Sequence, residues 1–169
     1  MEIEVFKFDA STEVEMLLRI AFAAIVGGII GFERRRAARP AGIRTLALVA
    51  MGAAAFTVVS IFGFEGEEGQ MRDPARIAAQ VATGVGFIGA GTMIRSGGVV
   101  RGLTTASGIW MAAALGVAAG TGMYIFSFGG AVLAVAILFL LPRKADEDDN
   151  DDDSDDTTLS IQPRTNRTT

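Results

Sequence analysis

The sequence predicts an all-α polytopic membrane protein: a transmembrane bundle of about five helices followed by a disordered acidic tail. Two observations support this fold class. Charged residues gather in short clusters, and the apolar stretches between them are roughly 18 to 20 residues long, enough to cross a hydrocarbon core of about 30 Å. Nine acidic residues then fall within positions 146–156, where mutual repulsion and the lack of apolar side chains prevent folding.

The expected spans are five apolar segments at 14–32, 43–62, 77–94, 103–120 and 123–141. The third and fourth are diluted by Gly, Ala, Thr and Ser, so their helicity depends on packing as well as on hydropathy. The predicted organisation is an external N-terminal segment over 1–13, a transmembrane domain over 14–144 and the acidic tail over 145–169. Because acidic residues crowd the first 15 positions, no cleavable signal peptide is expected.

Basic residues near the span ends predict the orientation, since they are enriched on the cytoplasmic side. Three of them (Lys7, Arg72 and Arg76) flank one side. Nine flank the other: Arg34, Arg35, Arg36, Arg39, Arg44, Arg95, Arg101, Arg143 and Lys144. We therefore expect a multi-pass protein of the inner or plasma membrane with its N-terminus outside and its C-terminus in the cytoplasm.

Small residues recur four positions apart on three of the spans. Such a stripe lets two helix backbones approach closely, which matters in lipid because the hydrophobic effect does not drive helices together there. We expect spans one, three and four to touch closely through these stripes; the alternative is that the stripes form homo-oligomer surfaces. The stripe residues are Ala23, Gly27 and Gly31, then Ala78, Ala82, Gly86 and Ala90, then Gly108, Ala112, Gly116 and Gly120, with Gly89 and Gly91 as further packing candidates.

A D-P-x-R motif at 73–76 opens the third span. Asp followed by Pro is typical of a helix start, so capping by Asp73 is one interpretation. Gln80 and Thr83 follow one and two helical steps deeper on a similar face. The other interpretation is an external vestibule for a cation or proton, formed by Asp73, Arg76, Gln80 and Thr83.

Arg19 lies about five residues inside the first span, where a charge is costly unless it reaches the surface or finds a partner. Two interpretations stay open. The guanidinium either extends to the outer surface or pairs with Asp73 across the first and third helices.

The arginines of the opposite side suit anionic lipid headgroups or a specific anion or partner protein. Two motifs, G-I-R-T at 42–45 and R-G-L-T-T at 101–105, place Arg, Gly and hydroxyl groups at a helix N-terminus, which favours anions. Glu33 is expected to pair with the arginines that follow it. The candidate contacts are Glu33, Arg34, Arg44, Thr45, Arg101, Thr104 and Thr105.

The residue inventory argues against an enzyme. The chain has no Cys and no His, which removes thiol catalysis and most transition-metal sites and leaves a hard cation such as Mg²⁺ as the only metal expected. The hydroxyl side chains have no neighbouring base, and there is no phosphate-binding loop. No cofactor and no nucleic-acid partner is expected.

Three long runs add a family resemblance. The run G-F-E-R-R-R-A-A-R-P-A-G-I-R-T-L-A-L-V-A-M-G resembles the opening motif of the MgtC/SapB family, and the segments beginning D-P-A-R-I-A-A-Q and V-R-G-L-T-T-A-S-G are similar to its later motifs. The resemblance covers roughly residues 14–141. It implies an inner-membrane protein tied to magnesium homeostasis, whose best-known members act on other membrane proteins, including the ATP synthase. Leu46 stands where the family often has His, and the soluble C-terminal domain of longer members is replaced here by the acidic tail.

Two functional hypotheses follow. The first is a membrane protein that regulates a partner membrane complex. The second is a small passive transporter or channel for Mg²⁺ or H⁺. Spans 1–2 and spans 3–4 show a faint sequence similarity at an offset of 60 residues. This similarity is either an internal repeat of the kind found in transporters or a chance match. The expected partners are membrane lipids, another integral membrane protein complex and a second copy of the chain.

Overall fold

The computed structural model of the chain describes residues 8–63, 73, 75–96 and 99–141. The predicted acidic tail and most of the predicted N-terminal segment lie outside the described residues.

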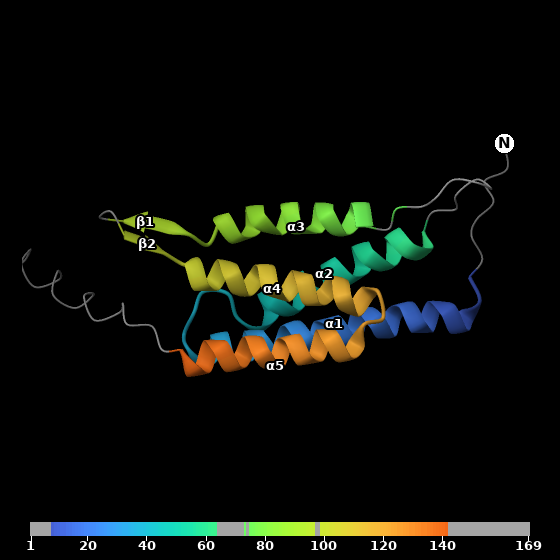
Figure 1. Cartoon of the computed structure of the whole chain (residues 1–169), viewed down its shortest axis with the longest axis horizontal. Coiled ribbons are helices and arrows are strands. Elements are labelled where there is room, and N and C mark those ends of the chain that lie inside the picture. Colours follow the sequence, from blue (N-terminus) through green and yellow to red (C-terminus); the bar gives the residue numbers. More distant parts are fainter. Residues whose placement is uncertain (1–7, 64–72, 74, 97–98, 142–169) are drawn as a thin grey trace, which may run out of the picture.

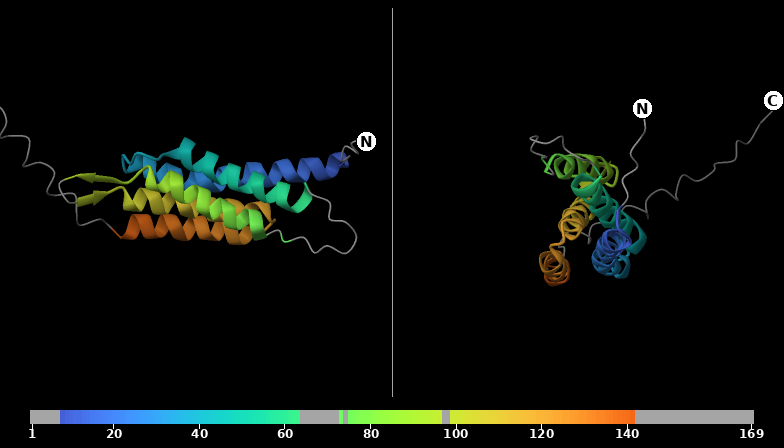
Figure 2. Two further views of the ribbon diagram at one scale, coloured as in Figure 1. Left: turned by 90° about the horizontal axis from the view of Figure 1, so that it is seen from above. Right: turned by 90° about the vertical axis from the view of Figure 1, so that its right-hand side faces the viewer.

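The described part is a helical bundle, which confirms the predicted fold class (Figure 1). Its helices are α1 (Ala10–Arg36), α2 (Ile43–Phe62), α3 (Ala75–Ala90), α4 (Leu103–Gly120) and α5 (Tyr124–Leu140). The helices α1, α2 and α4 are long and apolar enough to cross a membrane, and α3 and α5 are shorter apolar helices that run alongside them (Figures 1 and 2).

The connection between α3 and α4 differs from the prediction. The third span was expected to reach Ile94, but α3 ends at Ala90 and a short antiparallel hairpin follows, with β1 (Ile94–Ser96) paired to β2 (Val99–Arg101). Four β-branched residues, Thr92, Ile94, Val99 and Val100, stand in this segment and favour the extended conformation. The connection between α1 and α2 contains no strand. The helix pairs α1–α2 and α3–α4, whose sequences are faintly similar at an offset of 60 residues, therefore have different connections.

The centre of the bundle is α2, which is held between α1 and α4 by glycine contacts. Ala50 on α2 is fully buried, with Gly27 of α1 against one side and Gly116 of α4 against the other. A Cβ added to Gly27 would lie 2.3 Å from the Leu46 carbonyl oxygen, and one added to Gly116 would lie 2.2 Å from the Ala50 carbonyl oxygen. Neither site has room for a side chain, so these glycines set the distances between the three helices.

Two more glycines extend the same contacts. A Cβ on Gly31 would lie 2.6 Å from the Ile43 Cα, and one on Gly120 would lie 2.8 Å from the Ala54 carbonyl oxygen. The stripes on the first and fourth spans are therefore used inside the chain, and their main shared neighbour is α2.

The third stripe does not follow the prediction. Helix α3 packs on α4 and α2, which lie between it and α1 (Figure 2). The residues it buries are Val81, Val85 and Gly89, because the valines give this face more apolar area than the small-residue face. Gly86 is exposed with nothing within 4 Å of a hypothetical Cβ, and Gly91 lies in the turn after the helix. Gly108 is buried on α4, but a Cβ there would also meet nothing within 4 Å.

Helix α5 is attached to α4 and α1. The hydroxyl of Ser127, which is fully buried, donates a hydrogen bond to the Leu115 carbonyl oxygen of α4 at 2.8 Å. The rings of Phe22 on α1 and Tyr124 on α5 meet edge to face, with centroids 5.2 Å apart. Most other large side chains of α5 are exposed, as expected for a helix that faces lipid.

Gly116→Ala and Gly86→Ala form a matched pair that tests the central contact. Alanine favours a helix over glycine by up to about 1 kcal/mol, so Gly86→Ala should be neutral or stabilising. Gly116→Ala should lower the free energy of unfolding by about 1–3 kcal/mol, because its methyl group collides with the backbone of α2. Unfolding of the purified protein in detergent measures both changes, and equal effects of the two substitutions would contradict the assigned packing.

Candidate functional site

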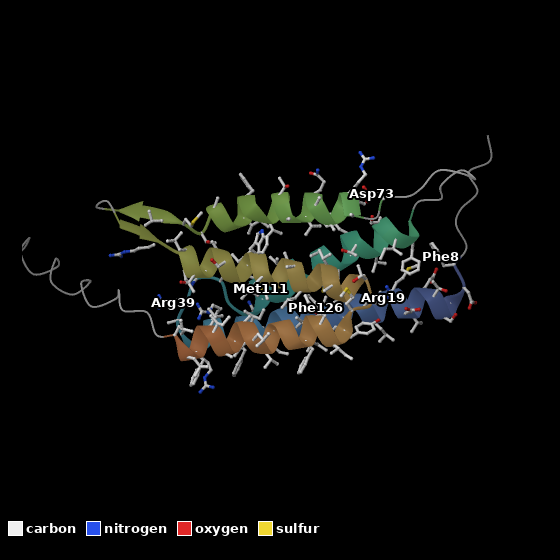
Figure 3. The ribbon with its side chains drawn as sticks, in the orientation of Figure 1. Phe8, Arg19, Arg39, Asp73, Met111 and Phe126 are labelled. Atoms are coloured by element: carbon white, nitrogen blue, oxygen red, sulfur yellow. The ribbon has the colours of Figure 1, made fainter. Side chains whose placement is uncertain are left out.

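Polar side chains gather at the two ends of the bundle. We call the end that holds Glu33, Arg34, Arg36 and Arg39 the arginine end, and the opposite one the Asp73 end. Figure 3 shows Arg39 at the first, where α5 finishes, and Arg19 and Asp73 towards the second.

Arg19 connects three helices near the Asp73 end. Its Nη1 donates to the Gly120 carbonyl oxygen at the last residue of α4, at 2.9 Å, and its guanidinium lies 5.4 Å from the ring centroid of Phe62 on α2. Its other hydrogen bonds, from Nε and Nη2, reach Glu15 one turn earlier on α1. A cation at the C-terminus of α4 is stabilised by the helix dipole and by the unpaired carbonyl groups there.

The hypothesis that Arg19 pairs with Asp73 is therefore not supported. Among the described residues the carboxylate partner of Arg19 is Glu15. Asp73 lies just before α3, a helix that packs on the far side of α2 and α4 from α1. The Gly120 partner of Arg19 could not be predicted, because a backbone carbonyl group has no side-chain signature.

Carboxylates mark the starts of two helices at the Asp73 end. Asp73 Oδ1 accepts a hydrogen bond from the Ala75 N–H at 3.0 Å, the capping role that the D-P-x-R motif predicts. Asp9 precedes α1 and accepts a hydrogen bond from the Ser11 hydroxyl, which lowers the pKa of the Asp9 carboxyl. Both carboxyl groups lie at the positive end of a helix dipole, where a negative charge is favoured.

The predicted vestibule residues are exposed on α3. Arg76, Gln80 and Thr83 face away from α2 and α4. The Thr83 hydroxyl donates a hydrogen bond to the Ala79 carbonyl oxygen, within its own helix. The structure thus brings Asp73, Arg76, Gln80 and Thr83 together on the outside of the bundle, without Arg19.

The arginine end begins with the way α1 terminates. Ala38 has a positive φ of 51°, and the Arg39 N–H donates back to the Arg34 carbonyl oxygen at 3.0 Å. This is a Schellman ending, in which glycine is usual because a Cβ in the left-handed conformation costs roughly 1–2 kcal/mol. The reversal turns the chain so that Arg39 faces the same cavity as Arg34.

Glu33 and Arg34 form a two-point ion pair, as the sequence predicted for Glu33. Arg34 Nε meets Glu33 Oε2 at 2.5 Å and Nη2 meets Oε1 at 2.9 Å. Arg34 is only 5% exposed. A guanidinium this buried needs its carboxylate partner, since breaking a buried pair from one side leaves an uncompensated charge.

A cavity of about 480 Å³ adjoins this pair. Glu33, Arg34, Arg39 and Thr104 line its polar side, and the last residues of α5 line its apolar side. Of the predicted contacts at this end, Glu33, Arg34 and Thr104 meet here. Sequence reasoning did not select Arg39 or the end of α5, because the chain reversal at Ala38 that places Arg39 has no glycine to mark it.

The other predicted contacts lie apart from the cavity. Arg44 and Thr45 are exposed on the first turn of α2, Arg101 is exposed at the end of β2, and Thr105 is buried. The residues before α2 and α4 are Gly42 and Gly102, and neither helix start has a side-chain cap. Within the described part of the chain, no three carboxylate side chains come close enough together to hold a metal ion.

Arg19→Ala and Glu15→Gln separate the two contacts of Arg19. The ion pair to Glu15 is exposed on the Glu15 side, so Glu15→Gln should change the free energy of unfolding by less than about 1 kcal/mol. Arg19→Ala also removes the charged hydrogen bond to Gly120 and should cost about 2 kcal/mol. Thermal unfolding in detergent compares them, and equal losses would show that the ion pair alone matters.

Comparison with known proteins identifies the family of the chain. The model of the MgtC family matches residues 20–146. The chain is 45% identical over 127 residues to the putative magnesium transporter YhiD of Escherichia coli K12, an alignment covering 73% of this chain and 59% of that protein. It is 39% identical over 132 residues to the protein SapB of Bacillus subtilis 168, covering 76% and 57%, and 43% identical over 122 residues to the protein MgtC of Brucella abortus 2308, covering 72% and 49%.

No solved structure matches the chain. The chain spans about half to three fifths of the length of these relatives. The family match covers most of the helical bundle described above, from Ile20 of α1 through α5, and on this basis the chain belongs to the MgtC family.

Proposed function

We propose that this MgtC-family membrane protein regulates a partner membrane complex and is linked in this way to magnesium homeostasis. The observation that supports the proposal best is the outward face of α3. This face carries Arg76, Gln80 and Thr83 together with the exposed ring of Phe87, and within the described chain nothing covers it.

The chemistry of the face favours a protein neighbour over lipid. Gln80 is exposed, and its side-chain amide makes no hydrogen bond to any described residue. A polar group facing hydrocarbon is costly unless another helix supplies a partner. Gly84 and Gly86 nearby have open space around them, so a second helix could approach the α3 backbone closely.

The interior of the bundle favours regulation over conduction through a single chain. Its described core is built of Ala, Val, Ile and Leu, and the polar groups buried there are few. Thr57 and Ser127 donate their hydroxyl hydrogen bonds to backbone carbonyl groups. Between Arg19 and the Glu33–Arg34 pair, the described interior contains no charged side chain that would help a cation across.

The magnesium link and the orientation have separate support. A relative at 45% identity is named a putative magnesium transporter. The excess of basic residues at the arginine end supports a cytoplasmic location for this end, by the positive-inside rule.

A passive transporter for Mg²⁺ or H⁺ is the second candidate, and the name of that relative favours it. Because the interior of one chain is apolar, such a path would run along the exposed face of α3, between copies of the protein. Asp73, Arg76, Gln80 and Thr83 would then line it.

A photoreactive amino acid in place of Gln80 tests the partner proposal in native membranes. We expect crosslinks to an integral membrane protein other than this chain, identified by mass spectrometry. The matched control is the same amino acid at Ile125 on α5, which is 92% exposed to the surroundings and should crosslink to lipid. Absence of a protein adduct at Gln80, or the same adducts at both positions, would argue against a partner on α3.

Flux through proteoliposomes distinguishes the two candidates. A regulator should leave trapped Mg²⁺ and pH indicators unchanged when an ion gradient is applied. If the purified protein dissipates the gradient, and Asp73→Asn or Gln80→Leu slows it about tenfold or more, the transporter is correct and regulation alone is wrong.

A further inference from the structure

We propose that the acidic segment at 146–156 docks on a cluster of exposed arginines at the arginine end of the same chain. The cluster consists of Arg35 and Arg36 in the last turn of α1 and Arg44 in the first turn of α2. We call these three residues the open arginines. The inference does not depend on whether the protein regulates a partner or transports an ion.

The open arginines lie close together where α1 ends and α2 begins. Gly42 directly precedes α2, and a Cβ added to it would lie 3.8 Å from the Arg35 Cβ. Arg44 follows two residues later, so the first turn of α2 adds its charge beside the last turn of α1. All three side chains are exposed, so the cluster is accessible to an anion from outside the bundle.

The described chain does not neutralise these three charges. None of the open arginines forms an ion pair or a side-chain hydrogen bond with a described residue. Arg36 lies over the ring of Phe32, 5.7 Å from its centroid, a contact that leaves the positive charge in place. Glu33 is the only described carboxylate at this end, and both of its oxygens accept hydrogen bonds from Arg34.

The acidic segment is tethered within reach of the cluster. Phe139 of α5 lines a cavity of about 750 Å³ together with Arg36, so α5 ends beside the open arginines. Asp146 follows Leu141 by only five residues, or at most about 18 Å of extended chain, and Asp156 follows it by at most about 54 Å. A short flexible tether of this kind gives an effective concentration on the order of millimolar.

Charge complementarity makes this segment a better occupant than an anionic lipid. The segment carries nine acidic residues, which repel one another until a cationic surface compensates them. A single exposed ion pair contributes little, so the attraction depends on several pairs formed together by one tethered chain. A phospholipid headgroup is untethered and is itself repelled by the acidic segment. We therefore expect the segment to cover the open arginines and to compete with other anions for them.

The chain has no cysteine, so two introduced cysteines can carry spin labels without background labelling. One replaces Ser154 in the acidic segment, and the other replaces Thr45, which is exposed beside Arg44. Double electron–electron resonance then measures the distance between the labels in nanodiscs containing phosphatidylglycerol. At low salt we expect a short, narrow distance distribution. At about 1 M NaCl, where the Debye length is about 3 Å, the mean distance should rise by about 10 Å or more and the distribution should broaden.

Changing the nine acids to amides should give the broad distribution even at low salt, and this variant leaves the sequence of the bundle intact. Changing Arg35, Arg36 and Arg44 together to Gln should have the same effect. Arg76→Gln is the matched control, because Arg76 is an exposed arginine at the opposite end of the bundle, and it should leave the distribution unchanged. Thermal unfolding checks that each labelled variant is folded.

Four results would overturn the proposal. The first is a distance that responds neither to salt nor to the amide substitutions. The second is an unchanged distance in the triple arginine variant, and the third is an equal effect of Arg76→Gln, which would mean unspecific charge attraction. The fourth is a segment that lies close only in nanodiscs of pure phosphatidylcholine, since anionic headgroups would then be the occupants of the open arginines.

Discussion

The contact on which the rest of the structure depends is the placement of Ala50 between Gly27 and Gly116. Inside lipid, apolar side chains gain little by leaving the solvent, so association depends on van der Waals contact between backbones that approach closely. Both glycines meet the backbone or the methyl group of the same alanine, which fixes α1 and α4 against α2. This register places Arg19 beside the end of α4 and the Glu33–Arg34 pair beside its start.

The two polar ends differ in what they can do. At the Asp73 end, Arg19 is hydrogen-bonded to Glu15 and Gly120 and lies over the ring of Phe62, so its role is to hold three helices together. At the arginine end, the buried pair supports a cavity whose wall contains further arginines. Helix α3 begins beside Asp73, is attached to the bundle through one face and presents Arg76, Gln80 and Thr83 outward. A bundle with an apolar interior and polar side chains on the outward face of α3 suits a role exerted on its neighbours.

Much of the fold could be predicted from the sequence, because span length and charge clusters indicate where the apolar helices lie, although α1 extends four residues beyond its predicted span at each end. The bounds of α2 and α4 were predicted to the residue, and the capping role of Asp73 followed from its motif. Which helices touch could not be predicted. Gly86 and Gly116 occupy equivalent stripes, yet one is exposed and the other meets a neighbouring backbone. The partner of Arg19 could not be predicted either, because its long side chain reaches several turns and its acceptor is a carbonyl group.

The unequal lengths of the helices have a consequence for the surrounding bilayer. Helices α3 and α5 have 16 and 17 residues, or about 24–26 Å, whereas α1 has 27 residues, or about 40 Å. A hydrocarbon core of about 30 Å is too thick for the first two and too thin for an upright α1. The membrane must therefore thin beside α3 and α5 while α1 tilts or projects, at a cost of a fraction of a kcal/mol per Å. Bilayer thickness is thus a physical variable to which this protein is coupled, and thinner membranes should favour it.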